Sequence, residues 1–294
     1  MELKLTAQRS GRLSSFLRGE LEMSSGLMNR LKYQSRFLVN GTPVFTNYAV
    51  APGDVITVLL EEPEPEYPAE EMPLTIVYED EYLLALDKPA GMLIHPSRSR
   101  DTGTLANGVI AYYQKTGQKG AFHPCTRLDR DTFGIVLLGK NSHIHGLLGN
   151  LHAQGAIRKT YEALVWGQME QDAGIIDAPI ARRPLPSLLR YVGPEGAPAR
   201  TEYQVMERYE NAAHLRLFPI TGKTHQLRVH CAYIGHPILG DPQYGSAESL
   251  RWSEKLGFSG QQLCAVSLEL PHPITKEPLR LESTMGVEKN RIKK

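Results

Sequence analysis

The first sixty residues place apolar side chains in short runs separated by polar breaks, and the pattern predicts two small helices. The first helix is expected to begin at Ser14 or Ser15, because serine suits a helix N-cap, and to run through Leu21. Ser24 or Ser25 begins the second helix, in which leucine and methionine recur at helical spacing. The chain therefore opens with two short helices.

Strands are expected to complete this N-terminal module. Residues 37–44 carry Asn40-Gly41 between apolar runs, which is typical of a tight hairpin. Pro52-Gly53 then forms a turn into a strand over residues 55–60. Two helices, a hairpin and one more strand make a small, compact module.

Residues 61–73 interrupt the apolar pattern with six Glu and four Pro in thirteen positions. Such a segment buries little surface and continues neither a helix nor a strand. It is predicted to be an acidic, proline-rich linker between two domains.

The rest of the chain is rich in strand patterns. Strands are expected at residues 74–78, 82–86, 135–138 and 160–166. Asn141 or Ser142 begins a helix with one apolar face, and Gly155 ends it. Many strands with few helices indicate a mixed layer of sheet and helix. The basic end, residues 289–294, is expected to fray.

Composition bounds the class of protein. A chain of 294 residues with 41% hydrophobic positions has room for two folded domains. Its three cysteines are odd in number and form no CxxC pair, so neither a disulfide framework nor a zinc knuckle is expected. The polar start of the chain and the absence of a long apolar run predict a cytoplasmic protein with no membrane contact.

The formal net charge of +1 hides an uneven distribution. Residues 1–60 hold seven Lys or Arg against four Asp or Glu, residues 61–87 hold none against ten, and residues 88–160 hold ten against three. Two basic stretches flank an acidic one. This pattern fits either an ordinary mixed surface or two regions that meet nucleic acid.

Three segments carry candidate chemistry, and the first is residues 126–134. It concentrates charged side chains directly before the apolar run at 135–138. One interpretation is a salt-bridged turn. The other makes one carboxylate a nucleophile, since an aspartate held by a cation stays ionised at neutral pH.

The second segment, residues 222–230, contains Gly-Lys-Thr, yet a phosphate-binding loop needs Gly where this chain has Leu217. His225, His230 and His236 match no zinc spacing, so no metal is expected.

The third segment, residues 158–167, places Tyr161 on an alternating strand beside two cations. Taken alone, that tyrosine fits core packing better than catalysis.

The N-terminal order of helix, helix, hairpin, Pro-Gly-Asp turn and strand resembles the S4-like, or alpha-L, RNA-binding domain. The resemblance implies phosphate contacts from basic residues, which bind the RNA backbone without selecting a sequence. A solvated helical face is the alternative. The candidate RNA-binding residues of this module are Arg12, Arg18, Arg30, Lys32 and Arg36.

The remaining motifs together resemble the RluA-like family of pseudouridine synthases over residues 74–284. They are, in chain order, Tyr78-Glu79-Asp80, Lys88-Pro89-Ala90-Gly91 with His95-Pro96, residues 127–132 (RLDRDT), Lys159-Thr160-Tyr161, residues 222–230 (GKTHQLRVH) and residues 235–241 (GHPILGD). Several ordered motifs are far more specific than any one of them. The resemblance implies an α+β fold whose catalytic domain has a mixed, largely antiparallel sheet.

This resemblance also implies roles for particular residues. Asp129 would be the nucleophile, attacking either ribose carbon 1′ or the uracil ring, and Arg228 would hold it ionised. Tyr161 would lie against the target base and take part in removing the carbon 5 proton. Arg127 would either fill the space that the flipped nucleotide leaves or contact a phosphate. Lys223 is a further candidate for RNA binding, and no cofactor is implied.

The chain departs from the family pattern at three positions. Thr126 stands where the family usually has His, Phe133 where it has Ser, and Lys223 where it has Arg. Because the three catalytic positions are intact, these departures bear on substrate preference more than on activity.

The sequence thus predicts an S4-like RNA-binding domain at 9–60, a linker at 61–73, a pseudouridine synthase domain at 74–284 and a basic tail at 285–294. The expected function is isomerisation of specific uridines by a cofactor-independent monomer. Ribosomal RNA is the preferred substrate and transfer RNA is possible. The alternative is a non-catalytic RNA-binding or ribosome-assembly factor that keeps the fold.

Overall fold

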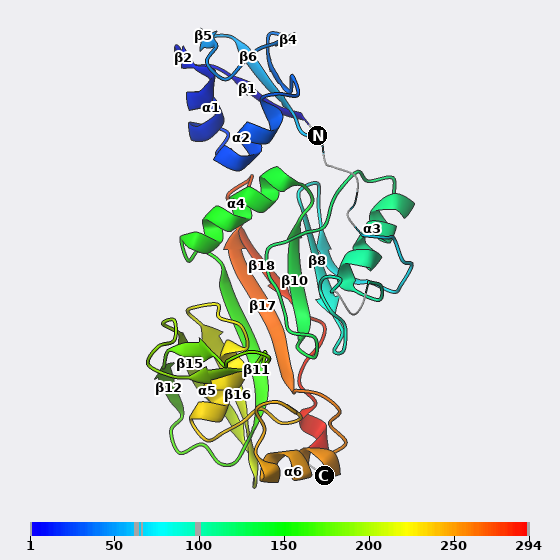
Figure 1. The fold of residues 1–294 in the computed structure, drawn as a ribbon, viewed down its shortest axis with the longest axis vertical. Helices are drawn as coiled ribbons and strands as arrows, with labels where there is room; N and C mark the ends of the chain where they lie inside the picture. The colour runs from blue at the N-terminus through cyan, green and yellow to red at the C-terminus, as the bar shows by residue number, and fades with distance from the viewer. Residues whose placement is uncertain (1, 62–64, 66, 98–100, 293–294) are drawn as a thin grey trace.

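A computed structural model describes residues 2–61, 65, 67–97 and 101–292. The molecule is elongated, with a small N-terminal module at one end and a long twisted sheet running through the rest (Figure 1). The last helices lie at the opposite end.

Two helices and two small antiparallel sheets form the N-terminal module. The helices are α1 (Leu13–Gly19) and α2 (Ser25–Leu31). The larger sheet has the order β1-β6-β3-β4, with strands Glu2–Thr6, Val55–Leu59, Phe37–Val39 and Thr42–Pro43, and β2 (Gly11–Arg12) pairs with β5 (Ala49–Val50). Apolar residues of both helices and of the central strands share one core.

The predicted turn chemistry of this module is confirmed in part. Asn40 and Gly41 both have positive φ, as a two-residue hairpin of this kind requires. Ser24 caps α2 by accepting a hydrogen bond from the Leu27 amide. The serine cap expected for α1 is wrong, because that helix begins directly after Arg12 with no side-chain cap. The strand β1 also precedes the expected start of the module at residue 9, yet it pairs with β6 along its whole length.

The acidic, proline-rich segment forms no helix or strand at its described residues, while residues 62–64 and 66 lie outside the description. Its second half contacts α3 (Leu105–Lys115). The Asn107 side chain donates to the carbonyl of Pro68, and the Asn107 carbonyl accepts from the amide of Glu70. Met72 lies against Gly108. Residues 67–73 therefore pack on the second domain.

The second domain is built on a ten-stranded sheet. Its order is β12-β15-β16-β11-β17-β10-β8-β7, with β18 also on β17 and β9 also on β10. In chain order the strands are β7 (Thr75–Glu79), β8 (Leu83–Lys88), β9 (His123–Pro124), β10 (Phe133–Gly139), β11 (Arg158–Trp166), β12 (Ala173–Asp177), β15 (Arg200–Arg208), β16 (Ala212–Pro219), β17 (Leu263–Pro271) and β18 (Pro278–Glu282). The pairings among these strands are antiparallel, except that β10 is parallel to β17. The expected α+β class is confirmed.

Helices cover both faces of the part of the sheet that contains β8 and β10 (Figure 1). Side chains of β8 and β10 alternate between a core under α3 and a core under α4 (Ser142–Ala153). This double burial explains why residues 83–86 and 135–138 are continuously apolar rather than alternating. Further elements are the hairpin β13 (Ile180–Arg182) with β14 (Arg190–Val192), α5 (Gln226–Tyr233), α6 (Ala247–Lys255) and a short 3₁₀ turn (Lys289–Arg291).

The basic end of the chain is not frayed as far as residue 292. Val287 is buried in a core that includes Leu164 and Phe258. Arg291 donates to the carbonyl oxygens of Leu256 and Gly257. The expectation of a frayed tail is therefore wrong for the described part of it, and residues 293–294 are not described.

Polar contacts between described residues join the N-terminal module to the sheet domain. Arg30 donates to the hydroxyl of Ser142 at the start of α4, at 2.6 Å. Lys276 pairs with Glu22 at 3.3 Å.

In the part of the chain that the structure describes, no helix has the length and apolar character to cross a membrane.

Candidate active site

Asp129 lies in the loop between β9 and β10, and both ends of this loop are fixed. At its end Gly134 has φ +102°, and a Cβ there would lie 2.3 Å from the carbonyl oxygen of Ala265. Glycine is required at that position on both counts. At its start the buried Thr126 hydroxyl accepts a hydrogen bond from the Leu137 amide at 2.9 Å. The loop that carries Asp129 is thereby held close to the sheet.

A buried lysine also holds the same loop by a hydrogen bond to its backbone. Lys88, at the end of β8, is fully buried and donates to the carbonyl oxygens of Pro89, Met92 and Arg130 at 2.8–2.9 Å. Burial lowers the pKa of Lys88 to about 8, against the opposite effect of two nearby aspartates. All three protons of its ammonium group donate hydrogen bonds, and one of these bonds holds the backbone of Arg130, the residue after Asp129.

Replacing Lys88 with methionine is expected to lower the free energy of unfolding by about 3 kcal/mol, because three buried carbonyl groups lose their donor. Chemical denaturation followed by circular dichroism measures this. The control is Lys115→Met at the exposed end of α3, for which a change within about 0.5 kcal/mol is expected. Equal effects of the two variants would contradict the supporting role.

Arg228 connects Asp129 to the interior of the domain. Its Nη1 donates to Oδ2 of Asp129 at 2.9 Å, and its Nε and Nη2 donate to the two oxygens of Asp241 at 2.7 and 2.8 Å. Nη2 also donates to the side chain of Gln243. Burial alone would lower the pKa of Arg228, but the two carboxylates raise it. The guanidinium is thus a permanent cation that bridges two aspartates, of which Asp241 is fully buried.

Tyr161 faces the same space from β11, paired with Leu217 and Ala265 of the neighbouring strands. Burial and the nearby Asp129 raise its pKa, so it is a neutral phenol at physiological pH. No hydrogen bond of its hydroxyl occurs within the described residues. The aromatic ring offers a flat apolar surface beside the carboxylate.

These side chains line a cavity of about 640 Å³. Its described lining contains five Lys or Arg and a single acid, Asp129. Arg228 is neutralised by its aspartates, and Arg130 pairs with Asp131 at 2.9 Å. Arg127, Lys159 and Lys223 remain as cations, and none of them has a carboxylate partner among the described residues. A cavity of this charge suits a polyanion.

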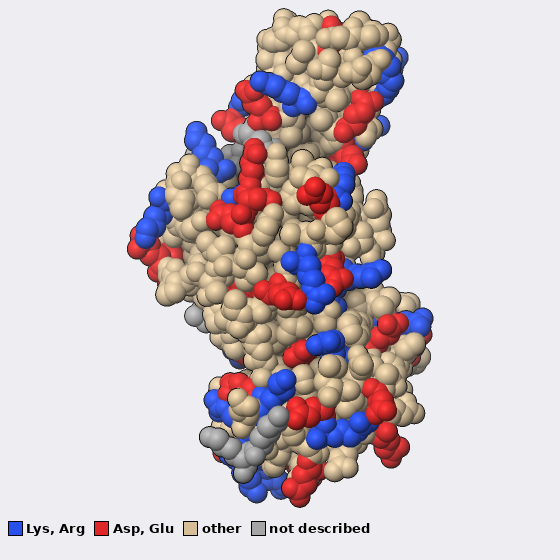
Figure 2. All heavy atoms as spheres, turned by 180° about the vertical axis from the view of Figure 1, so that it is seen from behind, with Lys and Arg blue, Asp and Glu red and all other residues tan. Residues whose placement is uncertain are grey.

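The five basic residues predicted in the N-terminal module lie apart from this cavity. Arg36 pairs with Glu61, Arg30 contacts Ser142, and Lys32 lies over the ring of Tyr33 at 4.5 Å. Arg12 and Arg18 are exposed. On the face seen in Figure 2, basic side chains lie beside acidic ones and form no continuous basic patch.

Two of the three departures from the family pattern, Thr126 and Phe133, occupy structural positions. Thr126 binds the backbone of β10. Phe133 is half-buried against the core that contains Leu164 and Phe258. Lys223 lies at the rim of the cavity with its side chain exposed.

From the sequence, no catalytic or supporting role was assigned to four residues near the nucleophile candidate: Lys88, Lys159, His225 and Asp241. All four stand in the motifs quoted for the resemblance. Spacing alone gave them no role, because their positions around Asp129 depend on the folding of the chain. The buried carboxylate of Asp241, thirteen positions after Arg228, is the clearest example.

The three histidines weighed as metal ligands do not converge. His230 contacts Thr201 and the carbonyl of Ala178, and His236 contacts the carbonyl of Trp166. Across the described ranges no group of three or more His, Cys, Asp or Glu is placed to hold a metal ion.

Comparison with known proteins identifies the family. The family described as RNA pseudouridylate synthase matches residues 82–233, which include Asp129, Tyr161 and Arg228. The chain belongs to this family. It is an RNA pseudouridine synthase, an isomerase that converts uridine to pseudouridine in RNA.

Curated relatives match along nearly the whole chain. An uncharacterized RNA pseudouridine synthase of Bacillus subtilis, YjbO, is 36% identical over 93% of this chain and 95% of its own length. Ribosomal large subunit pseudouridine synthase C of Vibrio vulnificus is 31% identical over 96% and 91%. Ribosomal large subunit pseudouridine synthase D of Nitrosomonas europaea is 36% identical over 79% and 69%.

Solved structures agree on the fold. The human RNA pseudouridylate synthase domain containing 4 protein has a TM-score of 0.60 at 25% identity, covering 74% of this chain and 93% of its own. The human domain containing 1 protein also has a TM-score of 0.60, at 23% identity, and covers 75% and 93%. The RluA-like membership expected from the sequence is confirmed.

Proposed function

We propose that this synthase uses Asp129 as its nucleophile on uridines of ribosomal RNA. The observation that carries the proposal is the ion pair between Asp129 and Arg228 at the wall of a basic cavity. Arg228 occupies Oδ2, which leaves Oδ1 of a partly exposed carboxylate free to attack. The arginine fixes the direction of the carboxylate.

Tyr161 and Arg127 have supporting roles in this proposal. The neutral ring of Tyr161 would stack on or against the target uracil and take part in removing the carbon 5 proton. Arg127 is exposed at the cavity beside the nucleophile. Chemistry at a glycosidic bond needs the nucleotide out of its stack, at a cost of about a few kcal/mol. The planar guanidinium of Arg127 would either fill the vacated space or bind a phosphate.

The proposed substrate is ribosomal RNA, with transfer RNA as the second choice. The relatives from Vibrio vulnificus and Nitrosomonas europaea are named ribosomal large subunit pseudouridine synthase C and D, and these names support the preference for ribosomal RNA. We place the activity in the cytoplasm and in a monomer. The S4-like N-terminal module, residues 9–60 with β1 added, would supply sequence-independent phosphate contacts.

Pseudouridine mapping by carbodiimide chemistry tests the substrate. Total RNA from cells with and without the gene is compared, and one or a few ribosomal positions are expected to lose their signal. A loss confined to transfer RNA would assign the substrate to that class. An unchanged map together with no turnover by the purified protein on either RNA would favour a binding or ribosome-assembly factor.

The role of the N-terminal module gives a separate prediction. Substituting Arg12, Arg18 and Lys32 by glutamine is expected to weaken RNA binding and to reduce the slope of log K against log salt by about 2–3, at about 0.7–0.9 per phosphate contact. Filter binding at several salt concentrations measures the slope. Arg9→Gln is the control, because Arg9 is already paired with Glu20 at 2.9 Å. A slope equal to wild type would refute the phosphate contacts.

A further inference from the structure

His225 is the nearest titratable side chain to Asp129 that the proposed function leaves without a role. It precedes α5, lines the cavity, and is 16% exposed. Its backbone adopts the left-handed conformation with φ +58°, in which histidine, like asparagine and aspartate, is enriched among residues other than glycine.

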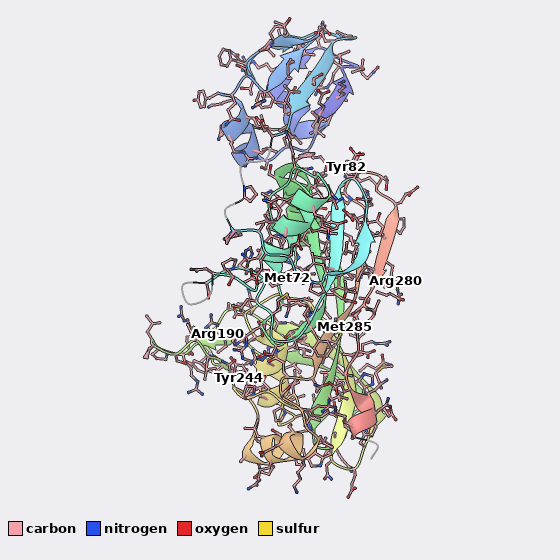
Figure 3. All side chains as sticks on the ribbon, turned by 90° about the vertical axis from the view of Figure 1, so that its right-hand side faces the viewer. Met72, Tyr82, Arg190, Tyr244, Arg280 and Met285 are labelled. Carbon is pink, nitrogen blue, oxygen red and sulfur yellow. The ribbon has the colours of Figure 1, made fainter. Side chains whose placement is uncertain are left out.

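A chain of hydrogen-bond contacts links the backbone of Arg190 to the ring of His225 through the hydroxyl of Tyr244. The backbone amide of Arg190 donates to the hydroxyl oxygen of Tyr244 at 2.9 Å. The hydroxyl proton remains available to Nδ1 of His225, which lies 2.7 Å from the hydroxyl oxygen. Figure 3 shows Arg190 and Tyr244 close together at the base of a hairpin that projects from the body. With the Tyr244 hydroxyl as the donor to Nδ1, the neutral imidazole carries its proton on Nε2.

The surroundings keep this imidazole neutral. Burial lowers the pKa of His225, and the cations Arg228 and Arg190 lower it further. Asp129 and Asp241 act in the opposite direction but do not reverse the shift. The ring is therefore a neutral N–H donor at physiological pH.

The free donor of His225 faces the free oxygen of the nucleophile. Nε2 lies 3.9 Å from Oδ1 of Asp129, beyond hydrogen-bond range, while Oδ2 is held by Arg228. Within the described residues Nε2 has no hydrogen-bond acceptor. A donor and an attacking oxygen therefore stand side by side in the cavity, and both are available to a substrate.

We propose that His225 is a catalytic hydrogen-bond donor to a carbonyl oxygen of the target uracil, oriented by Tyr244. This inference rests on the proposed function of Asp129. If Oδ1 attacks carbon 1′, the new O–C bond forms as the C–N bond breaks, and its electron pair passes to the uracil and its carbonyl oxygens. If Oδ1 attacks ring carbon 6, the π electrons shift to carbonyl oxygen 4. Negative charge develops on a carbonyl in both cases, where a preformed N–H donor is most effective.

Two substitutions at His225 separate this role from a structural one. Glutamine carries an N–H at about the reach of Nε2, whereas asparagine is too short but, like histidine, tolerates the left-handed backbone. With total RNA from cells lacking the gene as substrate, we expect His225→Gln to stay within about tenfold of the wild-type single-turnover rate and His225→Asn to lose about 10²–10³-fold. RNA affinity should be unchanged in both. The reverse order of rates would overturn the proposal.

Tyr244→Phe tests the orientation of the ring. Loss of the hydroxyl frees Nδ1, and we expect the single-turnover rate to fall about tenfold with RNA affinity unchanged. Tyr191→Phe is the matched control, because Tyr191 lies next to Arg190 on β14 and its hydroxyl contacts only the exposed Glu195 among the described residues. Equal rates for the two variants, or a loss of affinity without a loss of rate, would contradict the positioning role.

Asp129→Asn in the same assay distinguishes a failure of the proposed nucleophile, Asp129, from a failure of the proposed hydrogen-bond donor, His225. An active Asp129→Asn protein would refute the proposed nucleophile, whatever the histidine variants do. An inactive Asp129→Asn protein with a fully active His225→Asn protein would refute the hydrogen-bond donor alone.

Discussion

Asp129→Asn is expected to lower the single-turnover rate by about 10⁴–10⁶-fold, the range found when a nucleophile is removed. The amide has nearly the same shape and still accepts a hydrogen bond from Arg228, but its oxygen is a poor nucleophile. Mass spectrometry of RNA nucleosides after incubation with excess enzyme measures the product. RNA affinity should stay near wild type, because the phosphate contacts come from other side chains.

Asp131→Asn is the matched control for this prediction. Asp131 lies two positions further along the same loop and pairs with Arg130 at 2.9 Å. Its loss is expected to reduce the rate by less than about tenfold, in line with the small energy of a surface ion pair. Comparable losses in the two variants would point to disruption of the loop rather than to a nucleophile.

The second large effect is expected at Arg228. Arg228→Ala removes the partner of Asp129 and also leaves the fully buried Asp241 without a cation. Breaking a buried pair on one side costs about 3–5 kcal/mol of folding free energy. We therefore expect a lower midpoint of thermal unfolding together with a rate loss of about 10²–10³-fold, while RNA affinity measured on the folded protein changes little.

A double variant separates the two effects of Arg228. Asp241→Asn combined with Arg228→Ala removes the unpaired buried charge, so stability should recover in part. The rate should not recover, because Asp129 still lacks its cation. Recovery of the rate with stability would show that Arg228 acts on the fold alone, and a loss confined to RNA affinity would assign it to a phosphate contact.

The sequence by itself determined the elements whose signals are local. The apolar runs at 83–86 and 135–138, Asn40-Gly41 and the Asn141 cap all lie within a few residues of the structure they specify. Because hydrophobic periodicity and turn chemistry act over short distances, they could be derived without partners. Ordered motifs, each of them local, were enough to identify the family.

Only the tertiary structure decided which side chains meet. Arg228 and Asp129 are 99 positions apart, and the motif resemblance rather than their spacing predicted their pairing. No sequence signal pointed to the bond between Asp241 and Arg228, to the three carbonyl partners of Lys88, or to the orientation of His225 by Tyr244. Burial and pairing depend on the order of strands in the sheet, which brings distant loops to one cavity. The charge state and direction of a buried group follow from those partners, and so they appear only when the chain is folded.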